Sequence, residues 1–107
     1  MNFGLSEEII NKINNVFKKY DQILEVKIYG SRAMGTYKKG SDIDLTLIGS
    51  NIDLKLINKI SNELDDLNLP YTFDLSIFAK IDNKDFIDHI NKVGILFYSK
   101  FSNPRHN

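Results

Sequence analysis

The sequence predicts one α/β (α+β) domain in which helices pack mainly on one face of a small mixed sheet. Its 107 residues fit a single domain, which we expect to span residues 1–107. Helical and strand patterns alternate four times along the chain, an order that is typical of a sheet covered by helices. Hydrophobic residues make up 42% of the chain and charged residues 26%, which is globular composition and argues against a disordered or fibrous chain.

A helix, a strand and a short helical segment are expected in the first part of the chain. Ser6 is a good N-cap because its hydroxyl can accept a hydrogen bond from the first helical turn, and apolar residues follow at helical spacing over residues 6–20. Alternating apolar and polar residues predict a strand over 24–29, which runs into Gly30-Ser31. The short, polar residues 32–41 favour a turn or two of helix followed by a loop.

The rest of the chain repeats this alternation. Residues after 41 show a strand pattern over 42–48, a helical pattern over roughly 53–67, a strand pattern over 71–79, a helical pattern from 86 to 93 and an extended finish over 95–98. Gly94 is placed to end the last helix. The remaining residues, 99–107, are polar and are expected to form a flexible tail.

The composition excludes several classes of protein. The chain has no cysteine, which excludes a disulfide scaffold and a thiolate metal site. Its longest apolar runs are only a few residues, whereas a membrane span needs roughly 20. The N-terminus shows no secretory signal, so a cytoplasmic location is expected. The 14 basic and 14 acidic side chains cancel, which argues against direct nucleic-acid binding.

Gly30-Ser31 lies where a predicted strand ends and a predicted helix begins. Backbone N–H groups at a helix start, with a hydroxyl beside them, favour phosphate, and glycine lets the backbone approach a ligand closely. An ordinary turn explains the same two residues without any ligand. The pair is therefore a candidate phosphate site that needs support from other residues.

Three aspartates are placed as a metal site requires. Asp42 and Asp44 are two apart on a predicted strand, so their carboxylates project from one face. Two like charges this close resist ionisation unless a cation lies between them, and carboxylate oxygens are ligands that Mg²⁺ uses. Asp74 lies on the polar face of the next predicted strand, and all three carboxylates converge if the two strands pair. The competing interpretations are a solvated strand face for the first two aspartates and an edge residue that blocks aggregation for the third.

Together these residues resemble the pattern of a known family. Gly30-Ser31, ten further residues and then Asp42-x-Asp44 form the G-S-x10-D-x-D signature of the DNA polymerase β-type nucleotidyltransferase superfamily. The longer forms G-S-R-A-x-G and S-D-I-D-L stand at the same places. Over nearly its whole length the chain resembles the minimal nucleotidyltransferases, the MNT family of MntA-like antitoxins that pair with HEPN-domain proteins. The resemblance implies the polymerase β-type nucleotidyltransferase fold.

Carried over to this sequence, the resemblance implies two Mg²⁺ ions and three catalytic carboxylates. Asp42 and Asp44 are expected to hold both metals. Asp74 is expected to hold the catalytic metal and to help activate the acceptor oxygen. The predicted catalytic and metal-binding residues are therefore the same three aspartates.

The resemblance also implies that ATP binds as substrate at the start of the motif. Gly30 and Ser31 are expected to bind the β- and γ-phosphates, and Arg32 to lie near the triphosphate, where a guanidinium suits phosphate geometry. Many relatives have a second arginine at the position of Met34, so this chain lacks a positive charge there. His89, which has no second histidine at ligand spacing, is interpreted as a structural residue.

The implied reaction is Mg²⁺-dependent transfer of AMP from ATP to a protein hydroxyl, a tyrosine of a HEPN-type toxin, with this chain as the antitoxin. Two other functions remain open. A catalytically inactive module of the same fold would neutralise a HEPN partner by contact alone. A small-molecule adenylyltransferase of the aminoglycoside-modifying kind is the other alternative, although those enzymes carry a further domain for the acceptor. No membrane partner is expected.

Overall fold

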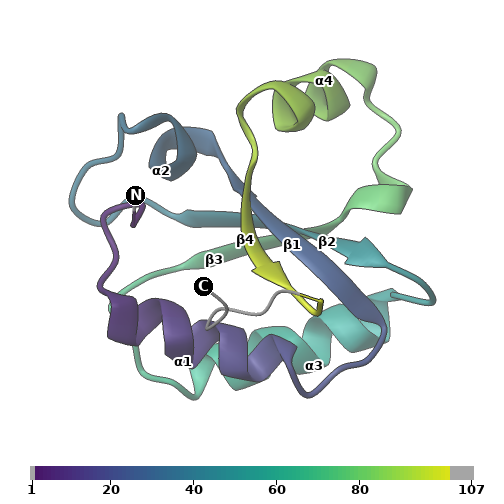
Figure 1. Cartoon of the computed structure of the whole chain (residues 1–107), viewed down its shortest axis with the longest axis horizontal. Coiled ribbons are helices and arrows are strands. Elements are labelled where there is room, and N and C mark those ends of the chain that lie inside the picture. The colour runs from purple at the N-terminus through teal and green to yellow at the C-terminus, as the bar shows by residue number, and fades with distance from the viewer. Residues whose placement is uncertain (1, 102–107) are drawn as a thin grey trace.

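A mixed four-stranded sheet in the order β3-β2-β1-β4 organises the chain (Figure 1). The computed structural model describes residues 2–101. The strand β1 (Ile23–Tyr29) pairs antiparallel with β2 (Ile43–Gly49) on one side and with β4 (Ile95–Ser99) on the other. The strand β3 (Phe73–Ile77) lies parallel to β2, so the predicted mixed sheet is confirmed. The expected tail begins within β4, and its residues 102–107 lie outside the described residues.

Helices connect the strands in the predicted alternation. Those within residues 2–101 are α1 (Glu7–Phe17), α2 (Gly30–Met34), α3 (Leu54–Asp65), the 3-10 turn η1 (Phe78–Lys80) and α4 (Lys84–Val93). Side-chain oxygens cap three of them: Ser6, Asp53 and Asn83 accept backbone N–H groups of α1, α3 and α4 at 3.2, 2.9 and 3.0 Å. The cap that the sequence predicts at Ser6 is therefore confirmed.

The main hydrophobic core lies between the sheet and the helices α1 and α3, which run side by side under one face of it (Figure 1). Because side chains alternate along a strand, every second residue of β2 enters this core, and Ile43, Leu45 and Leu47 are fully buried. Burying one such side chain contributes about 1.5–3 kcal/mol. One face of the sheet thus packs against α1 and α3, and the other face carries the polar residues Asp44 and Thr46.

The helix α4 covers part of that second face (Figure 1). Tyr29 and Ile90 are buried there, outside the main core cluster. The ring of Tyr29 meets the ring of Phe86 edge-on, with 5.4 Å between the ring centroids. The expected arrangement, helices mainly on one face, is confirmed, and α4 is the helix that lies on the other face.

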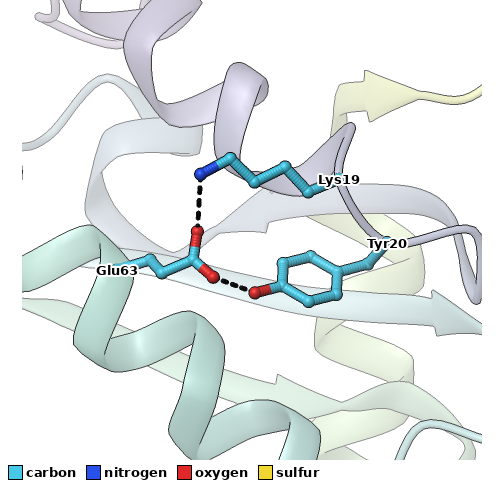
Figure 2. Close-up of polar contacts among 3 residues, drawn as sticks. All are labelled: Lys19, Tyr20 and Glu63. Carbon is cyan, nitrogen blue, oxygen red and sulfur yellow. Dashed lines mark hydrogen bonds and ion pairs between the residues drawn. The ribbon is translucent and has the colours of Figure 1, made fainter.

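A polar contact joins the end of α1 to α3 (Figure 2). Glu63 accepts hydrogen bonds from the Tyr20 hydroxyl and from the Lys19 ammonium, the latter with 2.9 Å between Nζ and Oε1. Burial, followed by the hydrogen bond and the charge of Glu63, raises the pKa of Tyr20 to about 12. The same hydrogen bonds, from Tyr20 and then Lys19, hold the pKa of Glu63 below its ordinary value. The helix α1 ends at Phe17, three residues earlier than predicted, where a tighter turn follows with Tyr20 N–H bonded to the Phe17 carbonyl, and the Tyr20 side chain reaches across to α3.

Tyr20→Phe tests this contact. At neutral pH the variant should lose roughly 0.5–1.5 kcal/mol of unfolding free energy, the usual net contribution of one hydrogen bond. Between pH 10 and about 12 the folded wild type keeps a Tyr20 proton that the unfolded chain releases, so this contribution is lost as pH rises. The stability difference between wild type and variant, measured by urea unfolding, should therefore shrink over that range.

Glu63→Gln provides the matched background for this test. Without the Glu63 charge, the Tyr20→Phe change should cost less, and a double-mutant cycle measures that coupling. A stability difference that stays constant from neutral pH to about pH 12 would show that folding does not raise the pKa of Tyr20.

Candidate active site

The three predicted metal ligands lie at one end of the sheet, where β2 and β3 begin. The two strands are parallel, and their register places Asp44 directly beside Asp74. Asp42 immediately precedes β2 and is exposed. The pairing of strands that the metal-site hypothesis requires is therefore present.

The carboxylates at this end of the sheet repel one another. Asp44 is half-buried, and burial, followed by the charges of Asp74 and Asp42, raises its pKa to about 6. A cation bound among these groups would relieve the repulsion, because it favours the ionised form of each carboxylate. Hard oxygen donors from adjacent strands are also the ligand type that Mg²⁺ uses. The residues present therefore fit a divalent metal ion.

The aspartates are neighbours without forming a closed cluster. Within residues 2–101, no group of three acidic or histidine side chains is gathered closely enough to hold a metal ion as it stands. Asp42 and Asp74 are exposed, so each can change its rotamer toward an ion. Metal binding by the three aspartates stays a prediction.

Gly30 brings the candidate phosphate turn against Asp44. It is the first residue of α2 and has a φ of +74°, in the left-handed region that glycine tolerates best. A Cβ at this position would collide with the Asp44 carboxylate. The sequence predicts glycine here for close approach to a ligand, and the structure adds close approach to Asp44. The half-buried Ser31 follows in the same turn, and nucleotide binding by these two residues stays a prediction.

Arg32 differs from its neighbours in the motif. Its side chain is only 2% exposed. Its Nε donates to the carbonyl of Ser41 at 3.1 Å and its Nη1 to the carbonyl of Phe3 at 2.9 Å. Two of its N–H groups are thus bonded to the backbone, and its expected position near the triphosphate stays a prediction. Met34 is 49% exposed at the end of α2.

Two residues that no sequence pattern marked as functional, Tyr29 and His89, lie beside the aspartates. Tyr29 lies opposite Asp44 in the register of β1 and β2, and burial raises its pKa, as do the charges of Asp74 and Asp44. His89 is half-buried with its ring 6.3 Å from that of Tyr29, and its charge opposes the rise in the pKa of Asp44. The half-buried position of His89 is compatible with the structural role expected from the sequence, and the spacing of Phe86 and His89 places both on one helix face.

Two of the three aspartates, Asp42 and Asp74, are exposed to solvent, and Asp44 is half-buried. Three recesses on the described part of the chain, with volumes of about 380, 620 and 250 Å³, are lined by other residues. The one of about 620 Å³ lies between α1 and β4, and the one of about 380 Å³ lies beyond the far ends of β2 and β3.

None of the helices within residues 2–101 has both the length and the apolar character that crossing a bilayer requires.

Solved structures with the same fold include three from toxin–antitoxin complexes. A chain of a toxin–antitoxin complex with AMP-PNP has 17% identity and a TM-score of 0.71 over 84% of this chain and 73% of that one. A chain of the Shewanella oneidensis complex of a tri-AMPylated HEPN toxin with MNT antitoxin has 13% identity and a TM-score of 0.67, covering 89% and 73%. A chain of the MntA-HepT toxin–antitoxin has 14% identity and a TM-score of 0.66, covering 88% and 73%. At these identities the likeness establishes the fold.

Family membership rests on the sequence itself. Compared by sequence, no curated protein matches the chain. The profile of the family described as "Polymerase beta, Nucleotidyltransferase" matches residues 11–103. That range contains the Gly30-Ser31 turn and all three aspartates of the site. The chain therefore belongs to the polymerase beta nucleotidyltransferase family.

Proposed function

We propose that this protein is an antitoxin that transfers AMP from ATP to a tyrosine hydroxyl of a HEPN-type toxin in a Mg²⁺-dependent reaction. The observation that carries the proposal is the register of β2 and β3, which sets Asp44 beside Asp74, with the Gly30 turn packed against Asp44. Membership of the family supports nucleotidyl transfer. The similar structures with AMP-PNP and with a tri-AMPylated HEPN toxin support AMP as the group transferred and a HEPN protein as the acceptor.

The aspartates and the phosphate turn have separate roles in this proposal. Asp42 and Asp44 hold two Mg²⁺ ions, and Asp74 contributes to the catalytic one. Ions bound there supply positive charge for the transferred phosphoryl group and for the departing pyrophosphate. Gly30 and Ser31 hold the β- and γ-phosphates through backbone N–H groups and the Ser31 hydroxyl.

In the reaction, the acceptor oxygen forms a bond to the α-phosphorus of ATP. The bond between the α-phosphorus and the bridging oxygen breaks, and pyrophosphate leaves. The acceptor hydroxyl gives up its proton toward Asp74. No covalent intermediate with the protein is needed, so the protein contributes mainly positioning and electrostatic stabilisation.

The open position of the aspartates favours a folded protein as the acceptor. A small acceptor needs a recess that encloses it, and none of the three recesses described above is lined by the aspartates. A protein partner brings its own surface and presents its hydroxyl to an open site. An AMP group adds a negative charge and bulk to the toxin, and either would obstruct RNA binding near the modified tyrosine. The zero net charge of this chain is compatible with a protein partner.

The alternative of an inactive module that blocks a HEPN partner by contact receives less support. Contact alone does not require three carboxylates on one sheet end. Burial, followed by the charges of Asp74 and Asp42, raises the pKa of Asp44, and this rise destabilises the folded chain at neutral pH. Ionisable groups that lower the stability of the folded state in this way are typical of catalytic and metal-binding sites.

Asp44→Asn should abolish AMP transfer and leave the fold intact, because asparagine keeps the size of the side chain and loses its charge. In the wild type the pKa of Asp44 rises from 3.8 to about 6. The folded state therefore holds a proton that the unfolded chain releases, and the wild type loses stability as pH rises through this range. The variant lacks that loss, so without Mg²⁺ its melting temperature at pH 7 should equal or exceed that of the wild type.

Added Mg²⁺ completes this test. It should raise the melting temperature of the wild type through binding to the folded state, and should have little effect on Asp44→Asn. Asp66→Asn, the same chemical change at the exposed end of α3, is the matched control and should keep both transfer and the Mg²⁺ response. Transfer activity retained by Asp44→Asn would rule out the proposed metal ligand.

The proposed acceptor is tested by intact mass spectrometry. The purified chain is incubated with ATP, Mg²⁺ and a candidate HEPN protein from its own genome, with Asp44→Asn as the inactive control. The HEPN protein should gain the mass of one or more AMP groups, and only with the wild-type chain and Mg²⁺. Tight binding without any mass gain would favour the contact module. AMP found on a small hydroxylated compound instead would favour the aminoglycoside-type alternative.

A further inference from the structure

Arg32 is the only charged side chain that is buried within residues 2–101. The chain has twelve lysines and only two arginines, so a positive charge is normally supplied by lysine. A guanidinium differs from an ammonium in being planar, with several N–H donors in one plane and two flat faces. A buried arginine in a lysine-rich chain therefore indicates a task that depends on this geometry.

The guanidinium of Arg32 contacts backbone and aromatic groups from separate parts of the chain. Its two hydrogen bonds reach the carbonyls of Ser41 and Phe3. Its Cζ lies 5.2 Å from the ring centre of Tyr37 and 4.9 Å from that of Tyr71. Among the described residues no carboxylate forms an ion pair with it. Carbonyl oxygens and aromatic faces are what stabilise this buried charge.

These contacts adjoin the residues of the proposed site. Arg32 belongs to α2, which begins with the phosphate turn. Ser41 immediately precedes Asp42, and Tyr71 lies three residues before Asp74. The segments that carry the phosphate turn and two of the carboxylates therefore meet at one side chain.

The Phe3 carbonyl is a fixed acceptor. The Phe3 side chain is buried, with its ring 5.8 Å from that of Phe97 in β4. Gly4, with a φ of +74°, leaves the space in which the Tyr37 ring lies, because a Cβ there would overlap that ring. The start of the chain is thus packed against α2 and its loop, and it anchors one side of the Arg32 guanidinium.

We infer that Arg32 is a positioning residue, which sets the spacing between the phosphate turn and the aspartates and does not bind the triphosphate itself. This inference rests on the proposed function. With 2% exposure, little of the side chain is available to a ligand. Lysine cannot substitute, because a compact ammonium lacks the planar set of N–H donors and the flat faces with which Arg32 bonds two carbonyls and contacts two rings. The role differs from the phosphate contact that the family resemblance implies.

Four variants separate the alternatives. Arg32→Lys keeps the charge and removes the planar group, and Arg32→Ala removes both. Tyr71→Leu keeps Arg32 and removes one of its aromatic contacts, so it remains informative if the Arg32 variants do not fold. Lys55→Ala removes one positive charge from the exposed face of α3 and is the matched charge control.

Three quantities are measured for each folded variant: the affinity for ATP with Mg²⁺ by calorimetry, the affinity for Mn²⁺ with AMP-PNP by electron paramagnetic resonance, and the amide exchange of the ligand-free protein. Arg32→Lys and Arg32→Ala should both weaken Mn²⁺ binding by roughly 10–100-fold, the usual effect of losing a residue that orients metal ligands. Tyr71→Leu should have a smaller effect in the same direction. Amides of residues 36–43 should exchange faster in ligand-free Arg32→Lys, and Lys55→Ala should match the wild type.

Either of two results would overturn the inference about Arg32 and leave the proposed function intact. If Arg32→Lys restores ATP and Mn²⁺ affinity that Arg32→Ala loses, charge is sufficient and Arg32 acts on the phosphates. If the Arg32 variants are less stable but bind Mn²⁺ and ATP like the wild type, the residue only stabilises the fold. If the wild type binds neither ATP nor Mn²⁺, the proposed function fails and the inference fails with it, so the two failures are distinguished by the wild-type measurement.

Discussion

The register of β2 against β3 is the constraint on which the rest of the site depends. It sets Asp44 beside Asp74 at the end of the sheet, where burial and like charge raise the pKa of Asp44. A slip of one residue would turn Asp44 into the core, because successive side chains of a strand point to opposite faces. The buried residues of β2 on the core face, Ile43, Leu45 and Leu47, prevent that slip. Hydrophobic burial on one face therefore holds in place charges that repel each other on the other face.

Two neighbours of Asp44, Gly30 and Tyr29, accommodate this arrangement. Gly30, in the left-handed region, leaves room for the carboxylate where any side chain would collide with it. Tyr29 lies opposite Asp44 in the neighbouring strand, and α4 packs on Tyr29 through Phe86 and His89. The exposed aspartates leave the remaining side open to solvent. The half-buried carboxylate is thus framed by protein, while a metal, a nucleotide and a large acceptor can still reach it.

Features that depend on local sequence were predictable, and those that depend on tertiary packing were not. The Ser6 cap and the burial of Ile43, Leu45 and Leu47 on one face of β2 follow from spacings of three and two residues, which act within one element. The burial of Arg32 depends on the Phe3 carbonyl, 29 residues away, and no local pattern marks that acceptor. The place of His89 depends on α4 covering the second face of the sheet. The hydrogen bond of Tyr20 depends likewise on a partner in α3, Glu63, 43 residues away.

The most direct test of the account is the titration of the Asp44 side-chain carboxyl by carbon-13 NMR, with and without Mg²⁺. Without Mg²⁺, Asp44 should titrate near pH 6, because burial and the charges of the neighbouring aspartates disfavour its ionised form. Mg²⁺ should lower this pKa markedly, because a bound cation favours the carboxylate. An Asp44 that titrates in the ordinary range near pH 4 without Mg²⁺, or whose pKa Mg²⁺ leaves unchanged, would contradict a metal site built on the register of β2 and β3.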